Sequence, residues 1–534
     1  MRYAAIALSM VGTVVFAALL PFSDLFLAPF VAAALLSAIG AWDILQKRHS
    51  IRRNYPILGN IRFGLEKVRP EIRQYFLESD LDGTPFNRSK RAIAYQRAKG
   101  DLDKRPFGTQ QDVYRGNFEW INHSLIPKAI AGHDFRVDVG GAHCRRPYSL
   151  SLFNISAMSF GALSANAIRA LNKGARLGNF AHDTGEGGYS DYHREFGGDI
   201  IWEIGSGYFG CRTPDGSFSP DIFARQAADP QVKMIEIKLS QGAKPGHGGV
   251  LPGAKVTPEI AGARGIPLGV DCVSPARHSA FSTPVEMMRF IAELRELADG
   301  KPVGFKLCIG HPWEFMALLK AMLETGTRPD FIVIDGSEGG TGAAPLEFVD
   351  HVGTPLREGL TFAHNSLVGA GLRASIRLGA AGRIVTAFDM ARVLALGADW
   401  CNAARGFMFA LGCIQSQSCH TDRCPTGVAT QDPLRQRGLV VPDKAERVRQ
   451  FHDSTLKALG ELLGAAGLAH PRELRPMHIQ RRLSPTEVRS FAELYPALRD
   501  GELLTGCSDP AYARHWASAD PLSFAAVETQ RSAA

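Results

Sequence analysis

The first 50 residues differ from the rest of the chain in their pattern of apolar positions. Residues 3–20 and 25–42 are almost wholly apolar, and the short stretch 21–24 (PFSD) separates the two runs. Each run has about the length of helix that crosses ~30 Å of hydrocarbon, although the first is near the short limit. The pattern predicts a transmembrane helical hairpin over residues 1–46.

Two other interpretations of the first apolar run remain open. A secretory signal peptide is also apolar, but here a second run follows at once and no small-x-small cleavage site precedes it. A single signal anchor, with the first run only dipping into the interface, is the other alternative. The positive charges of Arg2 and of residues 47–53 (KRHSIRR) are expected to stay in the cytoplasm. The hairpin would then hold the body of the chain at the cytoplasmic face of the cell (inner) membrane. The basic segment would touch anionic lipid, or serve only as a topology signal.

From about residue 148, short apolar runs typical of buried strands alternate with longer amphipathic stretches typical of helices. The predicted strands are Ser149–Ser156, Asn179–Asp183, Met234–Leu239, Gly269–Val273, Val303–Leu307, Phe331–Ile334, Ser375–Leu378 and Trp400–Ala403. Helices are expected between most of them, such as Ala165–Leu177, Pro284–Ala298, Pro312–Thr325 and Ala387–Leu396. Eight strands alternating with helices predict an α/β fold, a (β/α)8 TIM barrel over residues 148–440.

Three segments have patterns that do not belong to this alternation. The interval 190–230 is too long for a simple connection and predicts an inserted hairpin that includes Asp199–Ile204 and Gly207–Cys211. Residues 47–147 are mixed and charged, and we expect an N-terminal collar with helices at Glu66–Glu78 and Asn87–Lys99, in which residues 54–63 pack on the barrel. Residues 441–534 begin with a predicted helix, Asp443–Leu463, and end in a polar, alanine-rich tail that we expect to be partly disordered.

Composition narrows the class of function. A chain of 534 residues, 45% hydrophobic and 21% charged, is an ordinary globular composition with a large core. The net charge of +7 is mostly spread along the chain, and no aromatic-plus-basic pattern indicates a nucleic-acid partner. Nine cysteines without regular pairing favour a reducing compartment.

The most informative stretch is 398–432, which holds Cys413, Cys419 and Cys424 in the spacing C-x5-C-x4-C. Thiolates are soft ligands that match iron, so this short loop favours an iron–sulfur cluster. Zinc with His420 as a fourth ligand is an alternative, although a histidine next to Cys419 is awkward for one tetrahedral site. Inert packing of the three cysteines is the third interpretation, because a free cysteine packs like a small hydrophobic residue.

Four motifs together resemble the synthase domain of glutamate synthases. They are GCIQSQSCHTDRCPTGVATQD (412–432), IKLSQGAKPGHGGVLPG (237–253), HDTGEGG (182–188) and DGSEGGTGAAP (335–345). The resemblance covers roughly residues 110–480 and implies a barrel with FMN and a [3Fe-4S] cluster, the cluster being held by Cys413, Cys419 and Cys424. It implies an oxidoreductase acting on CH–NH2 donors, in which reduced FMN passes hydride to 2-iminoglutarate and yields glutamate.

The active site of such a barrel forms at the C-terminal ends of its strands. There Ala157, Met158 and Ser159 would let the backbone approach a flat ring and bond the polar edge of the flavin, or form only a tight turn. Glu186 follows the next strand, with a plain turn as the alternative. Gln241 and Lys244 lie in a glycine-rich loop and suit a dicarboxylate or oxo-acid substrate.

Lys306 ends the fifth predicted strand, where a lysine is costly to bury unless it is paired. In FMN-dependent barrels a lysine here typically faces the N1–C2 carbonyl edge of the flavin and stabilises negative charge on the reduced ring. A lysine that snorkels to a barrel end is the alternative. The predicted catalytic residues are therefore Lys306, Gln241, Lys244 and Glu186.

Glycine loops after the last strands would cradle the phosphate of the flavin. The full set of predicted cofactor-binding residues is Ala157, Met158, Ser159, Lys306, Gly339, Gly340, Thr341, Gly342, Gly382, Ala404, Arg405 and Gly406. The chain departs from the family at two places, where His247 and Ala380 replace residues that are usually acidic. The first puts the substrate or its acid–base chemistry in doubt, and the second weakens the predicted contact with the ribityl chain.

Two parts of the full family enzyme are missing from the pattern. No glutaminase domain with an early nucleophilic cysteine is recognisable, and no NAD(P)H fingerprint precedes a βαβ unit. Electrons would then come from a ferredoxin, a flavoprotein subunit or a membrane quinone system. The first hypothesis is reductive amination of 2-oxoglutarate or a related 2-oxo acid, and the second is a membrane-tethered amino-acid dehydrogenase that feeds electrons to the membrane. The third is a non-catalytic scaffold that retains its cofactors structurally.

Overall fold

The computed structural model describes residues 2–527 and divides the chain into two compact units. The first unit ends at Ser89 and the second begins at Lys90. The segment expected to form a collar is therefore split, and residues 54–63 belong to the first unit.

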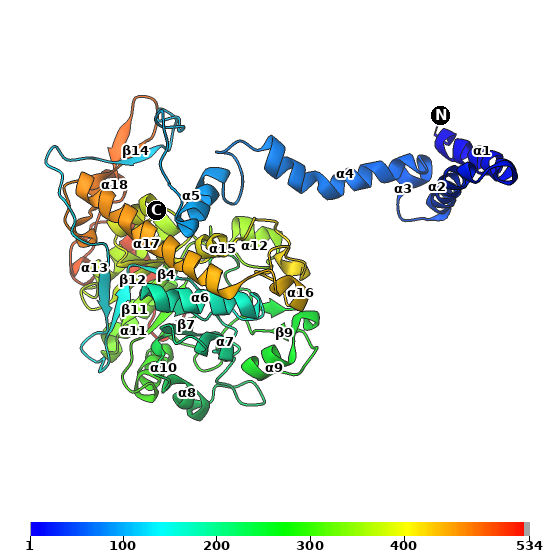
Figure 1. Cartoon of the computed structure of the whole chain (residues 1–534). Helices are drawn as coiled ribbons and strands as arrows, with labels where there is room; N and C mark the ends of the chain where they lie inside the picture. Colours follow the sequence, from blue (N-terminus) through cyan, green and yellow to red (C-terminus); the bar gives the residue numbers. More distant parts are fainter. Residues whose placement is uncertain (1, 528–534) are drawn as a thin grey trace, which may run out of the picture. The chain divides into compact units, whose positions relative to one another are not determined.

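The first unit is helical (Figure 1). Helices α1 (Ala4–Leu19) and α2 (Leu27–Leu45) form an antiparallel hairpin joined by two short helical turns, and α3 (Ser50–Asn54) and α4 (Leu58–Ile72) follow. The spans 4–22 and 24–45 are long and apolar enough to cross a membrane, with mean hydropathies of 2.2 and 2.0. Hydroxyl groups of Ser9 and Ser37 bond between the two helices at 3.1 Å, a pairing common between membrane helices. The predicted helix at Glu66–Glu78 begins eight residues too late, because α4 starts at Leu58 and continues into a π-helical turn, Arg73–Leu77.

The second unit is built on a closed barrel of eight parallel strands, which confirms the predicted TIM barrel (Figure 1). In barrel order the strands are β4 (Phe153–Ile155), β5 (His182–Asp183), β6 (Ile200–Ile204), β7 (Val232–Lys238), β10 (Val303–Leu307), β11 (Phe331–Asp335), β12 (Arg377–Ala381) and β13 (Trp400–Ala403). Most of their residues are fully buried, as expected for parallel strands covered by helices on the outside.

Two sequence-based strand predictions are wrong. The segment Asp199–Ile204, interpreted as part of an inserted hairpin, supplies barrel strand β6, whose five residues are all buried. The segment Gly269–Val273 lies outside the barrel, where β9 (Cys272–Val273) pairs antiparallel with β8 (Val250–Leu251). Burial explains the difference, because the sequence IIWEI can be covered on both faces, whereas Val273 is 63% exposed.

The first predicted strand, Ser149–Ser156, covers two elements. Its first half is β3 (Tyr148–Ser151), which pairs antiparallel with β2 (Arg136–Val139), and only its second half enters the barrel as β4. Leu152 separates the two halves and donates its amide to the Phe135 carbonyl oxygen at 3.0 Å. The two-stranded sheet β2–β3 therefore leads directly into the first strand of the barrel.

Helices follow most barrel strands, and the predicted helices at α5, α6, α10, α11 and α14 are confirmed. The bounds are α5 (Arg88–Lys99), α6 (Ala165–Gly178), α7 (Asp191–Arg194), α8 (Pro220–Ala227), α9 (Pro258–Arg264), α10 (Pro284–Leu297), α11 (Pro312–Thr325), α12 (Leu346–His351), α13 (Leu356–Gly369), α14 (Ala387–Ala395), α15 (Arg405–Leu411) and α16 (Pro433–Gln436). Several begin at a side-chain cap, such as Thr283 with Glu286 at the start of α10.

The C-terminal extension packs on the barrel. Helix α17 (Val441–Ala465) lies along α6, where a Cβ on Gly174 would come within 2.4 Å of Val448 (Figure 1). Strands β1 (Glu119–Ile121), β14 (Ile479–Arg482) and β15 (Val488–Ser490) form a small sheet, followed by α18 (Phe491–Leu494), α19 (Glu502–Thr505) and α20 (Pro510–Ser518). Trp516 of α20 packs near Met316 of α11, so the chain is ordered well into the predicted tail. The remainder of that tail, 528–534, lies outside the described residues.

Candidate functional site

A cavity of about 180 Å³ opens at the C-terminal ends of the barrel strands. It is lined by Ala157, Met158, Ser159, Ala162, Leu163, Gly185, Glu186, Glu203, Lys238, Gln241, Gly340, Thr341, Gly342, Ala404, Arg405, Met408, Cys419 and Ala429. These residues come from strands β6 and β7 and from the segments after β4, β5, β7, β11 and β13, so the structure brings together motifs that lie more than 200 residues apart in the sequence. Ten of the predicted catalytic and cofactor-binding residues line this cavity, together with the predicted metal ligand Cys419.

Close backbone packing explains why glycine recurs in these loops. A Cβ on Gly242 would lie 1.8 Å from the carbonyl oxygen of Gly336, so the loop after β7 packs directly on the loop after β11. Gly185 has φ +64°, and a Cβ there would lie 2.7 Å from the amide nitrogen of Ser159. Larger side chains would separate the loops and open the cavity wall.

One wall of the cavity carries an ion pair. Lys238 Nζ lies 2.9 Å from Glu186 Oε2. Burial acts to raise the pKa of Glu186, but the nearby Lys238, Arg264 and Lys244 outweigh it and lower the pKa, so this carboxylate stays ionised. The wall therefore presents a fixed pair of opposite charges to any ligand in the cavity.

A second cavity of about 100 Å³ adjoins the first and shares Ser159, Glu186 and Cys419 with it. Lys244 lines this second cavity, and its Nζ donates a hydrogen bond to the Gly248 carbonyl oxygen at 3.1 Å. Among the described residues no carboxylate lies within ion-pair distance of Lys244 Nζ. Its ammonium group, which also lowers the pKa of the nearby Glu186, bonds a neutral oxygen and is suited to a ligand carboxylate.

His247 lies apart from both cavities. It is exposed, its Nδ1–H donates to the Gly248 carbonyl oxygen at 2.8 Å, and its ring stands edge-on to Phe348 with ring centres 5.4 Å apart. Within the described chain it lines neither cavity. The departure from the family at this position therefore changes the outer surface of the loop.

Lys306 lies inside the barrel, beneath the cavity rather than on its wall. Its side chain is only 4% exposed, and its Nζ forms ion pairs with Glu203 and, at 3.1 Å, with Glu236 Oε1. Asp183 completes this cluster, since carboxylate oxygens of Asp183, Glu203 and Glu236 all lie within 4.8 Å of one another. The pairing offsets the cost of burying the lysine, and the alternative of a snorkelling side chain does not hold. Its predicted role against the flavin stays a prediction.

The interior cluster holds protons near neutral pH. Burial raises the pKa of Glu236 to about 7 and raises that of Asp183, to which the neighbouring Glu236 also contributes. For Lys306, burial acts to lower the pKa, but Glu203, Glu236 and Asp183 outweigh it and raise the value. Glu203 also lines the cavity, so the cluster reaches the ligand space through this side chain.

The cysteine loop reaches the same cavity. Cys419 lines it, and the loop is fastened on both sides: Tyr95 Oη donates to the Cys413 carbonyl oxygen at 2.6 Å, and Lys255 Nζ donates to the Cys419 carbonyl oxygen at 2.9 Å. Cys424 is buried, with its Sγ 3.4 Å from Thr426 Oγ1. The loop is thus placed beside the predicted flavin site by contacts from two distant segments.

A backbone amide reaches one of the three thiols. The Gln415 amide donates to Cys413 Sγ at 3.5 Å, the type of bond that stabilises cluster sulfur. Cys419 and Cys424 lie in the same loop as Cys413, so the three predicted ligands come from one segment.

The predicted phosphate end is formed by Arg405. Its Nη2 donates to the Glu338 carbonyl oxygen at 3.0 Å, and its guanidinium lies where a Cβ on Gly340 would be. Burial lowers the pKa of Arg405 to about 10, and the positive charge of Arg383 contributes, so this end of the cavity favours an anion. Gly339, Gly382 and Gly406 lie close by but do not line the cavity of the described chain. The residues present therefore fit a flavin phosphate on Arg405 and a ring against residues 157–159.

Two residues of the site were missed by the sequence analysis. Lys238 was included in a motif but given no role, and Glu203 was placed in a supposed hairpin. The signal was present for Glu203, the one charged residue in the strand IIWEI, and for Lys238 at the end of VKMIEIK, since a charged residue in a buried strand must find a partner.

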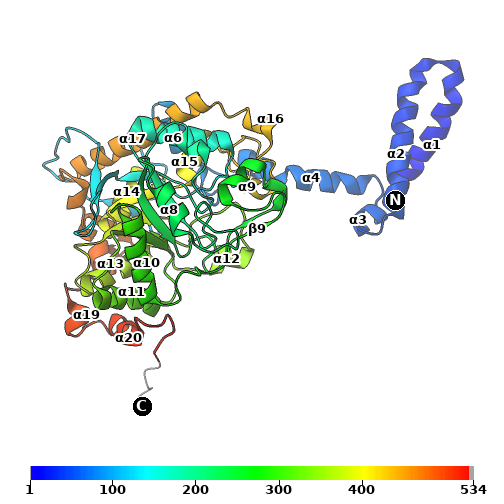
Figure 2. The same ribbon diagram turned by 90° about the horizontal axis from the view of Figure 1, so that it is seen from below.

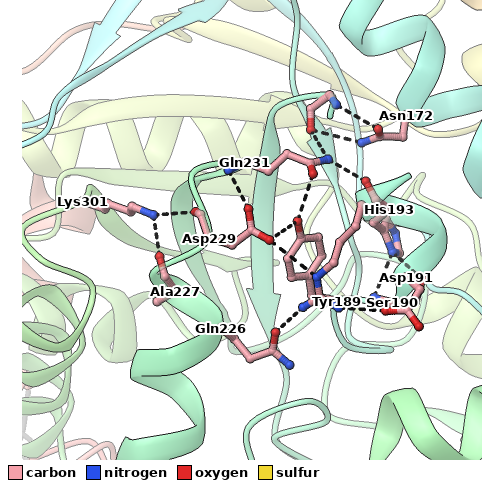
Figure 3. Close-up of polar contacts among 12 residues, drawn as sticks. Asn172, Tyr189, Ser190, Asp191, His193, Gln226, Ala227, Asp229, Gln231 and Lys301 are labelled. Carbon is pink, nitrogen blue, oxygen red and sulfur yellow. Dashed lines mark hydrogen bonds and ion pairs between the residues drawn. The ribbon is translucent and has the colours of Figure 1, made fainter. Parts of the chain in front are cut away.

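A polar network occupies the opposite, N-terminal ends of the strands (Figure 3). Gln231 bonds the carbonyl oxygens of His193 and Gly198, and Tyr189 Oη donates to Asp229 Oδ2 at 3.1 Å. Lys301 donates to the carbonyl oxygens of Ala227 and Asp229. These contacts join the segments that begin β6, β7 and β10, a position in barrels associated with stability rather than with catalysis.

Comparison with known proteins gives consistent matches. Residues 137–469 match the sequence profile described as "Conserved region in glutamate synthase". The chain is 39% identical over 481 residues to the glutamate synthase large subunit-like protein YerD of Bacillus subtilis, covering 82% of this chain and 91% of that protein. It is 36% identical over 321 residues to the archaeal-type glutamate synthase [NADPH] of Thermotoga neapolitana, covering 60% of each chain. Among solved structures, a mandelate oxidase mutant with an FMN adduct aligns with a TM-score of 0.40 and 14% identity, over 81% of this chain and 99% of that one.

Proposed function

Because the chain belongs to the glutamate synthase family, we propose that it is a flavin- and iron–sulfur-dependent oxidoreductase that aminates a 2-oxo acid reductively. The proposed substrate is 2-oxoglutarate or a related 2-oxo acid, with ammonia as the nitrogen source. One observation carries the proposal: Cys419 of the cysteine loop, Arg405 and the ion pair Lys238–Glu186 meet at one cavity.

The cavity has the chemistry that an oxo acid requires. Lys244 offers a positive charge to a substrate carboxylate, and the Gln241 amide can orient the oxo or imino group by hydrogen bonding. Both lie in the loop after β7, so a substrate held by them would extend over the mouth of the barrel. Glu186 fixes the position of the Lys238 ammonium group.

FMN would lie against residues 157–159 with its phosphate on Arg405, a [3Fe-4S] cluster would be held by Cys413, Cys419 and Cys424, and together they would supply hydride and one-electron transfer. The protein itself supplies binding, orientation and protons. Reductive amination of an oxo acid consumes protons when the imine becomes an amine. Glu236, whose pKa burial raises to about 7, lies behind Glu203 and Lys306 and can supply that proton to a ligand in the cavity.

Electrons are proposed to come from a partner, either a ferredoxin, a flavoprotein subunit or a membrane quinone system. The apolar helices α1 and α2 support a membrane anchor, with the catalytic unit in the cytoplasm because the basic residues 47–53 follow the second helix. The anchor also favours a second candidate function, in which the same site oxidises an amino acid and passes electrons to the membrane.

Isotope-labelled turnover distinguishes these functions. The purified full chain is incubated anaerobically with dithionite-reduced methyl viologen, ¹⁵N-ammonium and a panel of 2-oxo acids, and the amino acids formed are identified by mass spectrometry. A ¹⁵N-labelled amino acid from one oxo acid is expected. Reduction of ferricyanide by an amino acid, without any formation of labelled product, would favour the dehydrogenase instead. The absence of both reactions in a protein that carries flavin and iron would favour a scaffold.

A further inference from the structure

Helix α4 carries an apolar stripe that nothing in the first unit covers. Leu58, Ile61, Leu65, Val68 and Ile72 recur at intervals of three and four residues, so they share one face of the helix. Their exposed fractions run from 38% to 59%. A stripe of five large apolar side chains this exposed to solvent is costly unless a partner covers it.

The opposite face of α4 already has its partner. The Phe63 ring packs under the Arg52 guanidinium at 4.4 Å and against His49, with ring centres 5.0 Å apart. A Cβ on Gly59 would lie 2.9 Å from the Arg52 Cα. Helix α3 therefore covers the face with Gly59 and Phe63, and the apolar stripe is the face that is left.

The start of α4 is held at the end of the second apolar helix. Asp43, in the last turn of α2, is 1% exposed and accepts hydrogen bonds from the Ile57 amide at 3.0 Å and from the Asn60 side chain. Figure 2 shows α4 running across the direction of α1 and α2 rather than along it. If the hairpin crosses a bilayer, α4 starts near the membrane surface and runs parallel to it.

The charges of α4 fit an anionic surface. The segment 58–77 contains four basic residues and two acidic ones. At about 100° per residue, Arg62, Arg69 and Arg73 fall along one flank of the apolar stripe. Arginines beside an apolar face can extend to lipid phosphates while the stripe lies among the acyl chains.

A second copy of the chain fits less well. Spacing of three and four also occurs in coiled coils, but these need at least three to four heptads, and α4 has only 15 residues. Pro70 inside the helix and the π-helical turn after Ile72 further interrupt a continuous seam.

We propose that α4 is a membrane-surface helix whose apolar stripe inserts at the headgroup–acyl boundary of an anionic bilayer. This inference rests on the proposed membrane anchor. It assigns the segment after the hairpin a function of its own, namely to hold the chain that leads to the catalytic unit flat on the membrane.

Site-specific photocrosslinking of the full chain in nanodiscs tests the proposal. p-Benzoylphenylalanine replaces Leu65 on the stripe, Lys67 on the polar face of the same helix, or Val14 on the exposed side of α1. Lipid adducts are measured by mass spectrometry in discs of phosphatidylcholine with and without phosphatidylglycerol. We expect adducts at Val14 and at Leu65, a several-fold lower yield at Lys67, and a yield at Leu65 that rises with phosphatidylglycerol while that at Val14 does not.

Three results would overturn the proposal in different ways. Adducts at Leu65 with a second copy of the chain, or with the barrel, would assign the stripe to protein. Adducts at Val14 without any at Leu65 would keep the anchor and refute the surface helix. Absence of lipid adducts at both positions would refute the anchor itself.

Discussion

The ion pairs of Lys306 give the sharpest test of how the barrel tolerates charge in its core. The change Lys306→Met keeps an unbranched side chain of similar length and removes the ammonium group. Glu203 and Glu236 then lose the cation that compensates their burial, because all three side chains are less than 5% exposed. Breaking a buried pair from one side leaves uncompensated charge and typically costs about 3–5 kcal/mol.

The expected shift in melting temperature is modest because the unit is large. Unfolding entropy scales with chain length, so on the order of 1 °C corresponds to each kcal/mol in a unit of this size. Lys306→Met should therefore melt about 3–5 °C below the wild type near neutral pH.

The loss should depend on pH in a defined direction. Burial raises the pKa of Glu236 to about 7, and removing Lys306 raises it further. A carboxyl whose pKa is higher in the folded state binds more protons there, so stability is present at low pH and is lost as pH rises through the folded pKa. The deficit of Lys306→Met should be smallest near about pH 5 and should grow towards about pH 8.

Lys301→Met is the matched control for this experiment. Lys301 is also buried, but it bonds only to the carbonyl oxygens of Ala227 and Asp229. Its removal should cost about 1–3 kcal/mol with little change between about pH 5 and pH 7. The measurement is thermal unfolding of both variants and the wild type by differential scanning fluorimetry at one scan rate, from about pH 5 to about pH 8. A Lys306→Met variant as stable as the wild type, or one whose deficit shrinks as pH rises, would refute the reasoning.

Three further predictions concern the site. Gly242→Ala should lower the flavin content of the purified protein and reduce the free energy of unfolding by about 1–3 kcal/mol, because the new Cβ would lie 1.8 Å from the Gly336 carbonyl oxygen. Gly262→Ala is the control, since the space around Gly262 is open and neither quantity should change. Flavin absorbance and melting temperature measure the two effects. Cys419→Ala should abolish bound iron while Cys401→Ala, a buried cysteine of β13, retains it, and equal iron in both would remove Cys419 from the cluster. His247→Glu should change kcat/KM by less than about threefold because His247 lies outside both cavities, and a tenfold change (about 1.4 kcal/mol) would place it in the reaction.

The sequence predicted the barrel because its parallel strands are short apolar runs separated by glycine-rich loops. Val303–Leu307 and Trp400–Ala403 have the bounds that their patterns indicated. The error at β6 has a physical cause, since its Glu203 is compensated by Lys306, which lies 103 residues away in β10. A local pattern cannot contain such a long-range pairing, and the length of the interval 190–230 indicated an inserted hairpin instead.

For the candidate site, the sequence predicted which loops meet but not where every side chain in them points. Loops such as 157–159 and 340–342 follow strands directly, so their meeting at one end of the barrel follows from the fold. The depth of Lys306 and the outward position of His247 depend on which way a side chain points at the end of its strand or in its loop. That direction is set by packing with neighbouring loops, such as Gly242 on Gly336.

The most direct test of the proposed chemistry is the visible spectrum of the full chain, purified anaerobically in detergent. After reduction with one equivalent of dithionite, 2-oxoglutarate and ammonium are added separately and then together. We expect flavin bands with a broad iron–sulfur shoulder, bleached by dithionite and restored only by the two substrates together. A colourless protein that neither FMN nor iron reconstitutes would contradict this prediction, and so would a reduced spectrum that no combination of oxo acid and ammonium reoxidises.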